Sequence, residues 1–105
     1  LVVELSYEEP VDAPETPALR RDLMAWPNPF NPSVSLRYEL DAQAAVRLDV
    51  FDLAGRRVAV VDSGLMDAGS HETLWRAEGL PSGVYLAQLR VNGQLRDSEK
   101  LVLLR

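Results

Sequence analysis

The residues that could carry catalysis in this 105-residue chain are few, and their spacing does not form an active site. The absence of cysteine removes thiol nucleophiles and cysteine-bound metals. His71 is the single histidine, so a serine–histidine–acid triad would depend on it, and Ser70 is too near in the chain to act as its nucleophile. No Gly-x-Ser-x-Gly elbow is present. We predict a structural or surface role for His71 and a chain that is not an enzyme.

The acidic residues also lack the spacing of a metal or glycosidase site. Asp49 and Asp52 are three residues apart and would point to opposite faces of a strand. Asp62, Asp67 and Glu72 straddle turns and leave only a loose calcium site open. A catalytic carboxylate pair needs a cleft, and the single glycines mark turns rather than a phosphate loop. The sequence predicts no catalytic residue, no metal site and no cofactor.

Charge separates the start of the chain from its body. The net charge is −5, and residues 1–25 hold six acids and two bases, a balance of −4. The remaining residues mix acids and bases almost evenly. Nucleic acids and anionic lipids both require clustered basic surface, so neither is an expected partner. No apolar run is long enough for a transmembrane segment.

Proline placement supports the same division. Six of the seven prolines lie between residues 10 and 32, and the first three alternate with acids and alanines, which prevents a stable helix or strand ladder. We expect residues 8–21 to form an acidic, extended linker. Leu1–Tyr7 has the composition of a short strand that ends an upstream domain, edges this one or pairs with a neighbour. Since the chain starts without methionine or a signal peptide, we expect it to be part of a longer protein.

Residues 22–105 show the alternation of strands with one buried face. About seven short strands are expected, with a turn signal about every ten residues and no helical period. Asn92-Gly93 is a strong hairpin turn, Gly55 marks another, and residues 41–45 fill a hairpin-sized gap. We predict an all-β fold, a small immunoglobulin-like antiparallel β-sandwich, with a closed barrel as the competing architecture.

The predicted core consists of the inward positions of these strands. The final apolar run does not alternate in polarity, so its strand is either covered on both faces or leaves an apolar strip exposed. The core positions are Val34, Leu36, Tyr38, Leu40, Val46, Leu48, Val50, Val58, Val60, Trp75, Tyr85 and Leu89, with some of residues 101–104.

The string Trp26-Pro27-Asn28-Pro29-Phe30-Asn31-Pro32-Ser33 is the most unusual in the chain. Each asparagine precedes a proline and is pushed towards extended backbone, where its side chain can accept an N–H two residues on in an Asx turn. We expect a stiff corner that opens the sandwich, with Phe30 pointing inward. The domain boundary then lies near residues 21–24.

Five further pieces follow this corner in order. They are Val50-Phe51-Asp52-Leu53-Ala54-Gly55-Arg56-Arg57-Val58, Ala68-Gly69-Ser70-His71, Trp75, Ser82-Gly83-Val84-Tyr85 and Lys100-Leu101-Val102-Leu103-Leu104-Arg105. Together with the corner, they resemble a type IX secretion C-terminal sorting domain (Por secretion tail), a group similar to the immunoglobulin-like domain of the flagellar hook-capping protein. The resemblance covers about residues 24–105. Thr73 and Arg76-Ala77 depart from the family pattern around the tryptophan.

The resemblance assigns roles to two groups of residues. The structural family motif maps onto Asn28, Pro29, Asn31, Pro32, Gly55, Trp75, Gly83 and Tyr85. The sorting signal, which the secretion machinery would read, maps onto Lys100, Leu101, Val102, Leu103, Leu104 and Arg105.

The resemblance implies a non-catalytic sorting module. It would direct an upstream cargo domain of the same chain through the periplasm and outer membrane to the surface of a Gram-negative, Bacteroidetes-like bacterium. The partner would be an outer-membrane protein of the secretion machinery, and many such domains are cut off after export. As a physical hypothesis, residues 99–105 form an edge strand that adds its backbone to the receptor, with Lys100 and Arg105 setting the register and the four apolar residues between them in contact.

Two other functions remain open at this point. The chain could be a structural or adhesive fibre subunit that exchanges Leu1–Tyr7 with its neighbour, which would appear as self-association. A carbohydrate-binding module would need coplanar exposed aromatics, for which Trp26 and Phe51 are the candidates.

Overall fold

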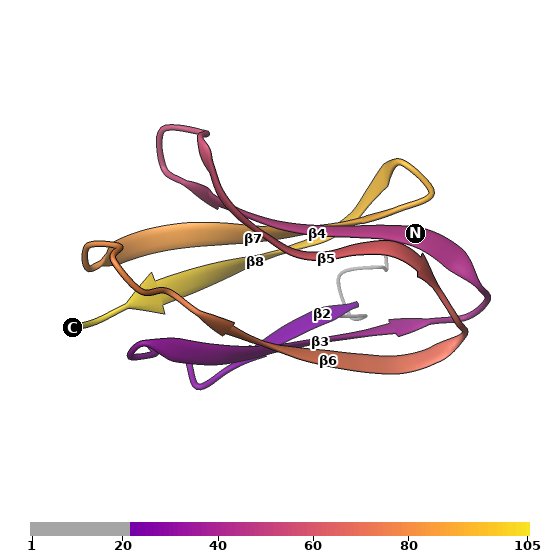
Figure 1. The fold of residues 1–105 in the computed structure, drawn as a ribbon, viewed down its shortest axis with the longest axis horizontal. Coiled ribbons are helices and arrows are strands. Elements are labelled where there is room, and N and C mark those ends of the chain that lie inside the picture. Colours follow the sequence, from indigo (N-terminus) through magenta and orange to yellow (C-terminus); the bar gives the residue numbers. More distant parts are fainter. Residues whose placement is uncertain (1–21) are drawn as a thin grey trace, which may run out of the picture.

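The computed structural model describes residues 22–105, which form seven strands in two facing antiparallel sheets (Figure 1). Leu1–Tyr7 and the linker 8–21 lie outside the described residues, so their roles and the domain division stay predictions. In the described part, no helix is long and apolar enough to cross a membrane. The strands are β2 (Leu23–Trp26), β3 (Ser33–Leu40), β4 (Ala44–Asp52), β5 (Arg57–Met66), β6 (Gly69–Arg76), β7 (Gly83–Val91) and β8 (Gln94–Leu103).

The strand order confirms the predicted sandwich. One sheet has the order β2-β3-β6 and the other β5-β4-β7-β8. The β4–β5 and β7–β8 connections are hairpins within the larger sheet, and Asn92 and Gly93 both have positive φ, as a tight hairpin turn requires. The connection 41–43 is not a hairpin, because β3 and β4 belong to different sheets. Its three residues span about 10 Å, the usual separation of packed sheets. Loop length alone therefore does not distinguish a hairpin from a connection between the two sheets.

The buried residues follow the predicted alternation, with one clear exception. The predicted core positions of β3 and β4 are all buried, as are Tyr85 and Leu89. Val60 is 48% exposed, contrary to prediction, while Val58 and Trp75 are only partly buried. The reason at Val60 is a β-bulge: Leu48 pairs with Asp62 but Asp49 pairs with Val60, which leaves an extra residue in β5 and reverses the alternation.

A polar bridge joins the two sheets between β3, β5 and β6. The Tyr38 hydroxyl and the Thr73 hydroxyl each donate a hydrogen bond of 2.9 Å to Asp62 Oδ2. Burial, reinforced by the hydrogen bond to Asp62, raises the pKa of Tyr38, so this phenol remains a donor at ordinary pH. Thr73, a departure from the family pattern, therefore has a defined partner across the sandwich.

Replacing Asp62 by alanine should destabilise the domain by about 1–3 kcal/mol, because two partly buried hydroxyls lose their acceptor. Urea unfolding followed by tryptophan fluorescence measures this loss. Glu78→Ala is the control, since it removes only an exposed ion pair with Arg76 and should change stability by less than about 0.5 kcal/mol. Equal effects of the two substitutions would contradict a structural role for the bridge.

Candidate functional site

The terminal strand β8 lies at the edge of the four-stranded sheet, where it pairs with β7. Its apolar run alternates in burial: Leu101 and Leu103 are fully buried in the core, whereas Val102 is half-buried on the outer face. Lys100 is exposed on that face, and its side chain makes no hydrogen bond or ion pair with the described residues. Leu104 is 54% exposed. The predicted sorting signal therefore divides into an inward half that belongs to the core and an outward half that a partner can reach.

From Lys100 onward, the outer backbone edge of β8 is closed by the segment 28–30, which we call the edge clamp. Asn28 Nδ2 donates to the Lys100 carbonyl at 2.7 Å, and Asn28 Oδ1 accepts from the Val102 amide at 2.9 Å. The Phe30 amide donates to the Val102 carbonyl at 2.8 Å, and the Phe30 carbonyl accepts from the Leu104 amide at 3.0 Å. The hypothesis that this backbone is available for strand addition is therefore wrong for the folded domain, since the clamp already uses these groups.

The asparagine–proline corner builds the clamp differently from expectation. The Asn28 side chain does not form an Asx turn, because its amide bonds to β8 instead of to its own backbone. Asn31 is exposed, and in residues 22–105 its side chain makes no hydrogen bond. Phe30 points inward as predicted, is 2% exposed, and its ring lies 5.9 Å from that of Trp75. The peptide bonds before Pro27, Pro29 and Pro32 are cis.

Arg105 fastens the end of the chain to the turn between β6 and β7. Its Nε donates to the Leu80 carbonyl at 2.6 Å and its Nη2 donates to the Ala77 carbonyl. Its backbone amide donates to Ser82 Oγ at 2.9 Å. The guanidinium that the resemblance assigned to the receptor therefore bonds within the domain.

The remaining motif residues gather at the same end of the sandwich, beside the C-terminus in Figure 1. Gly83 pairs with Leu103, and Tyr85 lies opposite Leu101. The buried Tyr85 hydroxyl donates to the Pro81 carbonyl at 2.7 Å. Gly55, with φ of 85°, makes the β4–β5 turn at this end. Gly83 and Tyr85 thus pair directly with the last strand, whereas Gly55 belongs to a hairpin on the far side of the sheet.

The β4–β5 turn depends on Asp52. Asp52 Oδ1 accepts from the amides of Ala54 and Arg56 at 3.0 and 2.9 Å, and Oδ2 accepts from Arg56 Nε at 3.1 Å. The Arg56 amide is the main cause that lowers the pKa of this carboxyl. A lowered folded-state pKa adds stability above the unfolded value, about 3.9, and that stability is lost as the pH falls through the folded value.

Acid should therefore loosen the native turn more than that of an Asp52→Asn variant. Below about pH 4 we expect the stability advantage of the native chain over the variant to shrink, because protonation of Asp52 removes the negative charge that the variant lacks at every pH. Unfolding curves at several pH values measure the difference. Parallel pH dependence of the two proteins from pH 7 to pH 2 would contradict this role of the carboxylate.

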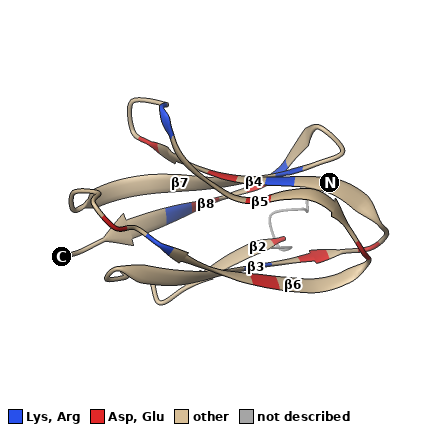
Figure 2. Ribbon diagram, in the orientation of Figure 1, with Lys and Arg blue, Asp and Glu red and all other residues tan. Residues whose placement is uncertain are grey.

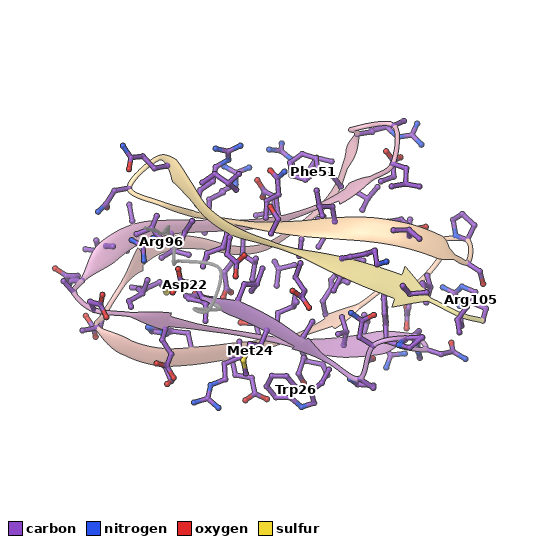
Figure 3. All side chains as sticks on the ribbon, turned by 180° about the vertical axis from the view of Figure 1, so that it is seen from behind. Asp22, Met24, Trp26, Phe51, Arg96 and Arg105 are labelled. Atoms are coloured by element: carbon purple, nitrogen blue, oxygen red, sulfur yellow. The ribbon has the colours of Figure 1, made fainter. Side chains whose placement is uncertain are left out.

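Neither His71 nor the two candidate aromatics form a site. His71 Nε2 lies 2.7 Å from the Asp67 carbonyl oxygen and the ring stacks on Tyr38, which is a structural role. Within residues 22–105, no group of three potential metal ligands occurs. Trp26 and Phe51 lie on opposite faces of the sandwich (Figure 3), so they cannot form the carbohydrate platform that was left open.

The match to a known family spans nearly the whole described domain. A family model described as "Secretion system C-terminal sorting domain" matches residues 24–104, from β2 to the residue after β8. The chain belongs to this family. A secretion-targeting role and export to the cell surface or the extracellular space follow from this membership, as the sequence resemblance indicated.

The sorting domain shares its fold with part of one solved structure. It is similar to part of dimeric latent PorU from Porphyromonas gingivalis, with a TM-score of 0.59 and 20% identity over 78% of this chain and 9% of that one. It also matches Pseudomonas fluorescens alkylpurine DNA glycosylase AlkC bound to DNA containing an abasic site analog, with a TM-score of 0.49 and 16% identity over 79% of this chain and 29% of that one. No curated protein matches the chain.

Sequence reasoning missed the residues that hold the terminus of the sorting domain. Ala77 is 1% exposed, and its amide donates to the Pro32 carbonyl at 2.8 Å while its own carbonyl receives Arg105. Leu80 and Ser82 supply the other two acceptors. Two of these three acceptors are backbone carbonyls, which any residue type provides, so the sequence carries little sign of them.

Proposed function

We propose that this sorting domain directs an upstream cargo domain across the outer membrane by type IX secretion, as a non-catalytic module. A receptor of the outer-membrane machinery recognises the folded domain through the outward side chains of β8. The observation that supports this is the state of Lys100, which is exposed and unpaired within the described domain, on a strand whose neighbouring residues Leu101 and Leu103 are fixed in the core.

The division of β8 gives each residue of the signal a separate task. Leu101 and Leu103 anchor the strand in the core, and Arg105 secures its end. Lys100 then projects from a fixed position, as the only lysine in the chain. Because the backbone that carries this ammonium is already ordered, binding costs no further backbone freedom, which favours specific pairing with a receptor carboxylate.

The edge clamp suits a domain that must travel folded. An open edge strand pairs readily with other chains and promotes aggregation. Asn28 and Phe30 close the outer edge of β8, so recognition relies on side chains rather than on backbone pairing. The signal at the end of β8 is therefore exposed without an open backbone edge beside it.

A transfer experiment tests this function. The full chain is fused to the C-terminus of a periplasmic reporter that lacks a sorting signal, and the fusion is produced in a bacterium that uses type IX secretion. We expect the reporter to become accessible to external protease, and to remain periplasmic in a strain without the translocation channel. Export in both strains, or in neither, would contradict the proposal.

A further inference from the structure

The outer face of the four-stranded sheet forms a continuous surface around Lys100. Strand register places Arg57, Phe51, Leu86 and Lys100 in one row across β5, β4, β7 and β8. Phe51 and Leu86 are half-buried at the centre of this row, and the two cations stand at its ends. Val84 and Val102 lie opposite each other in the neighbouring row towards the chain end. Arg47 and Arg90 lie opposite each other in a row on the other side of Phe51.

This face is hollowed rather than flat. The β4–β5 hairpin and the β7–β8 hairpin both rise from the same side of the sheet and frame the face between them (Figure 1). Beside the first hairpin lies a hollow of about 410 Å³. Phe51, Val84 and Leu86 are among the apolar residues that line it, and Arg90 is also among its lining residues.

This face carries more positive than negative charge, whereas the described domain is net negative. Residues 22–105 contain eleven acids and nine bases, a net charge of −2, whereas the outer rows hold four cations and one acid, Asp49. A second acid, Asp52, lines the hollow and pairs with Arg56 at 3.1 Å. Asp49 is buried and pairs with Arg47 at 3.0 Å. Basic segments accordingly appear on β4, on β8 and at the two raised hairpins in Figure 2.

Three of the four cations on this face are also unpaired, unlike those of the opposite sheet. In the described domain, Arg57, Arg90 and Lys100 form no ion pair, while Arg37 and Arg76 on the three-stranded sheet pair with glutamates at 3.3 and 2.6 Å. Unpaired cations around an apolar centre are complementary to carboxylates around an apolar centre.

We propose that this face, defined by Arg57, Phe51, Leu86, Arg90 and Lys100, is a docking surface for an acidic segment of a protein with apolar side chains at its centre. The proposal rests on the proposed function, because the protein that reads Lys100 is the one that would cover the rest of the face. The apolar floor would supply contact area, and the cations would orient the partner and speed its association.

A charge-reversal pair in the full-chain fusion tests the face. The variant Arg57→Glu with Arg90→Glu is compared with Arg37→Glu and Arg76→Glu, which changes the net charge by the same amount on the opposite sheet. We expect surface delivery to fall about tenfold or more in the first variant and less than about twofold in the second. Thermal unfolding of both purified variants checks that each remains folded.

The outcomes separate this proposal from the function itself. If the native fusion is not exported, the proposed function fails. If Lys100→Glu blocks export but the Arg57/Arg90 variant is exported normally, the function stands and the docking surface is overturned. An equal loss in both charge-reversal variants would also overturn it, since the effect would then follow net charge rather than this face.

Two other occupants of the face are tested with the purified full chain. Vesicles containing lipopolysaccharide serve as the probe for an anionic glycolipid, and sedimentation velocity serves for a second copy of the chain. We expect no vesicle binding and no dimer that depends on Arg57 and Arg90. Either interaction, if present in the native chain and lost in the Arg57/Arg90 variant, would overturn an acidic protein segment as the partner.

Discussion

Replacing Phe30 by alanine is expected to lower the free energy of unfolding by about 3–5 kcal/mol, the largest stability loss among the substitutions considered. Phe30 is 2% exposed and packs against Trp75, and its backbone forms both main-chain hydrogen bonds of the edge clamp. Truncation leaves a cavity between the corner and β8, at the point where Phe30 bridges Leu103. Loss of packing and loosening of the clamp therefore occur together.

Urea unfolding of the purified chain measures the effect, and Phe51→Ala is the matched control. Phe51 is half-buried on the outer face and contributes to no clamp, so its truncation should cost about 1 kcal/mol. A loss at Phe30 no larger than at Phe51 would show that the corner is not integrated with the core.

Replacing Lys100 by glutamate is expected to reduce surface delivery of the fusion about tenfold or more, because the reversed charge would repel the receptor carboxylate that we propose as the partner of the ammonium. The side chain is exposed and has no partner in residues 22–105, so the free energy of unfolding should change by less than about 0.5 kcal/mol. Export by protease accessibility and stability by urea unfolding are measured on the same variant.

Two companion substitutions define the specificity of this effect. Lys100→Arg keeps the positive charge and should retain most of the export. Arg76→Glu reverses an exposed charge on the opposite sheet and should be exported like the native chain. Normal export of Lys100→Glu would refute recognition through this side chain, whatever the export of Lys100→Arg and Arg76→Glu.

Deletion of residues 100–105 is a less informative experiment than these substitutions. It removes Leu101 and Leu103 from the core, and it leaves Asn28 and Phe30 without their hydrogen-bond partners on β8. A truncated chain would therefore fail to be exported for lack of a folded domain as well as for lack of a signal.

The alternation of apolar residues was sufficient to predict the strands and most of the core. From Val34 to Leu40 each inward position is buried, because a strand with one solvated face must alternate. Val60 shows the limit of this reasoning, since a bulge inserts one residue without any mark in the pattern.

The site was harder to predict than the fold because its contacts are distant in sequence. Asn28 finds its partners 72 and 74 residues away, and no local rule distinguishes those bonds from an Asx turn. The family resemblance singled out Asn28, Tyr85 and Arg105, but only the structure shows that all three support the last strand from within.

Locking the edge clamp tests most directly whether the receptor reads a domain with a closed edge. Asn31→Cys and Leu104→Cys lie one residue beyond the parallel Phe30–Leu103 bridge, and the chain has no other cysteine. The disulfide is verified by gel mobility without reductant, and Leu104→Cys alone sets the export baseline. We predict that the fusion reaches the surface with the disulfide intact, at the level of this baseline. Accumulation of the locked protein in the periplasm, with only reduced protein at the surface, would show that β8 must open its edge and would contradict this mechanism.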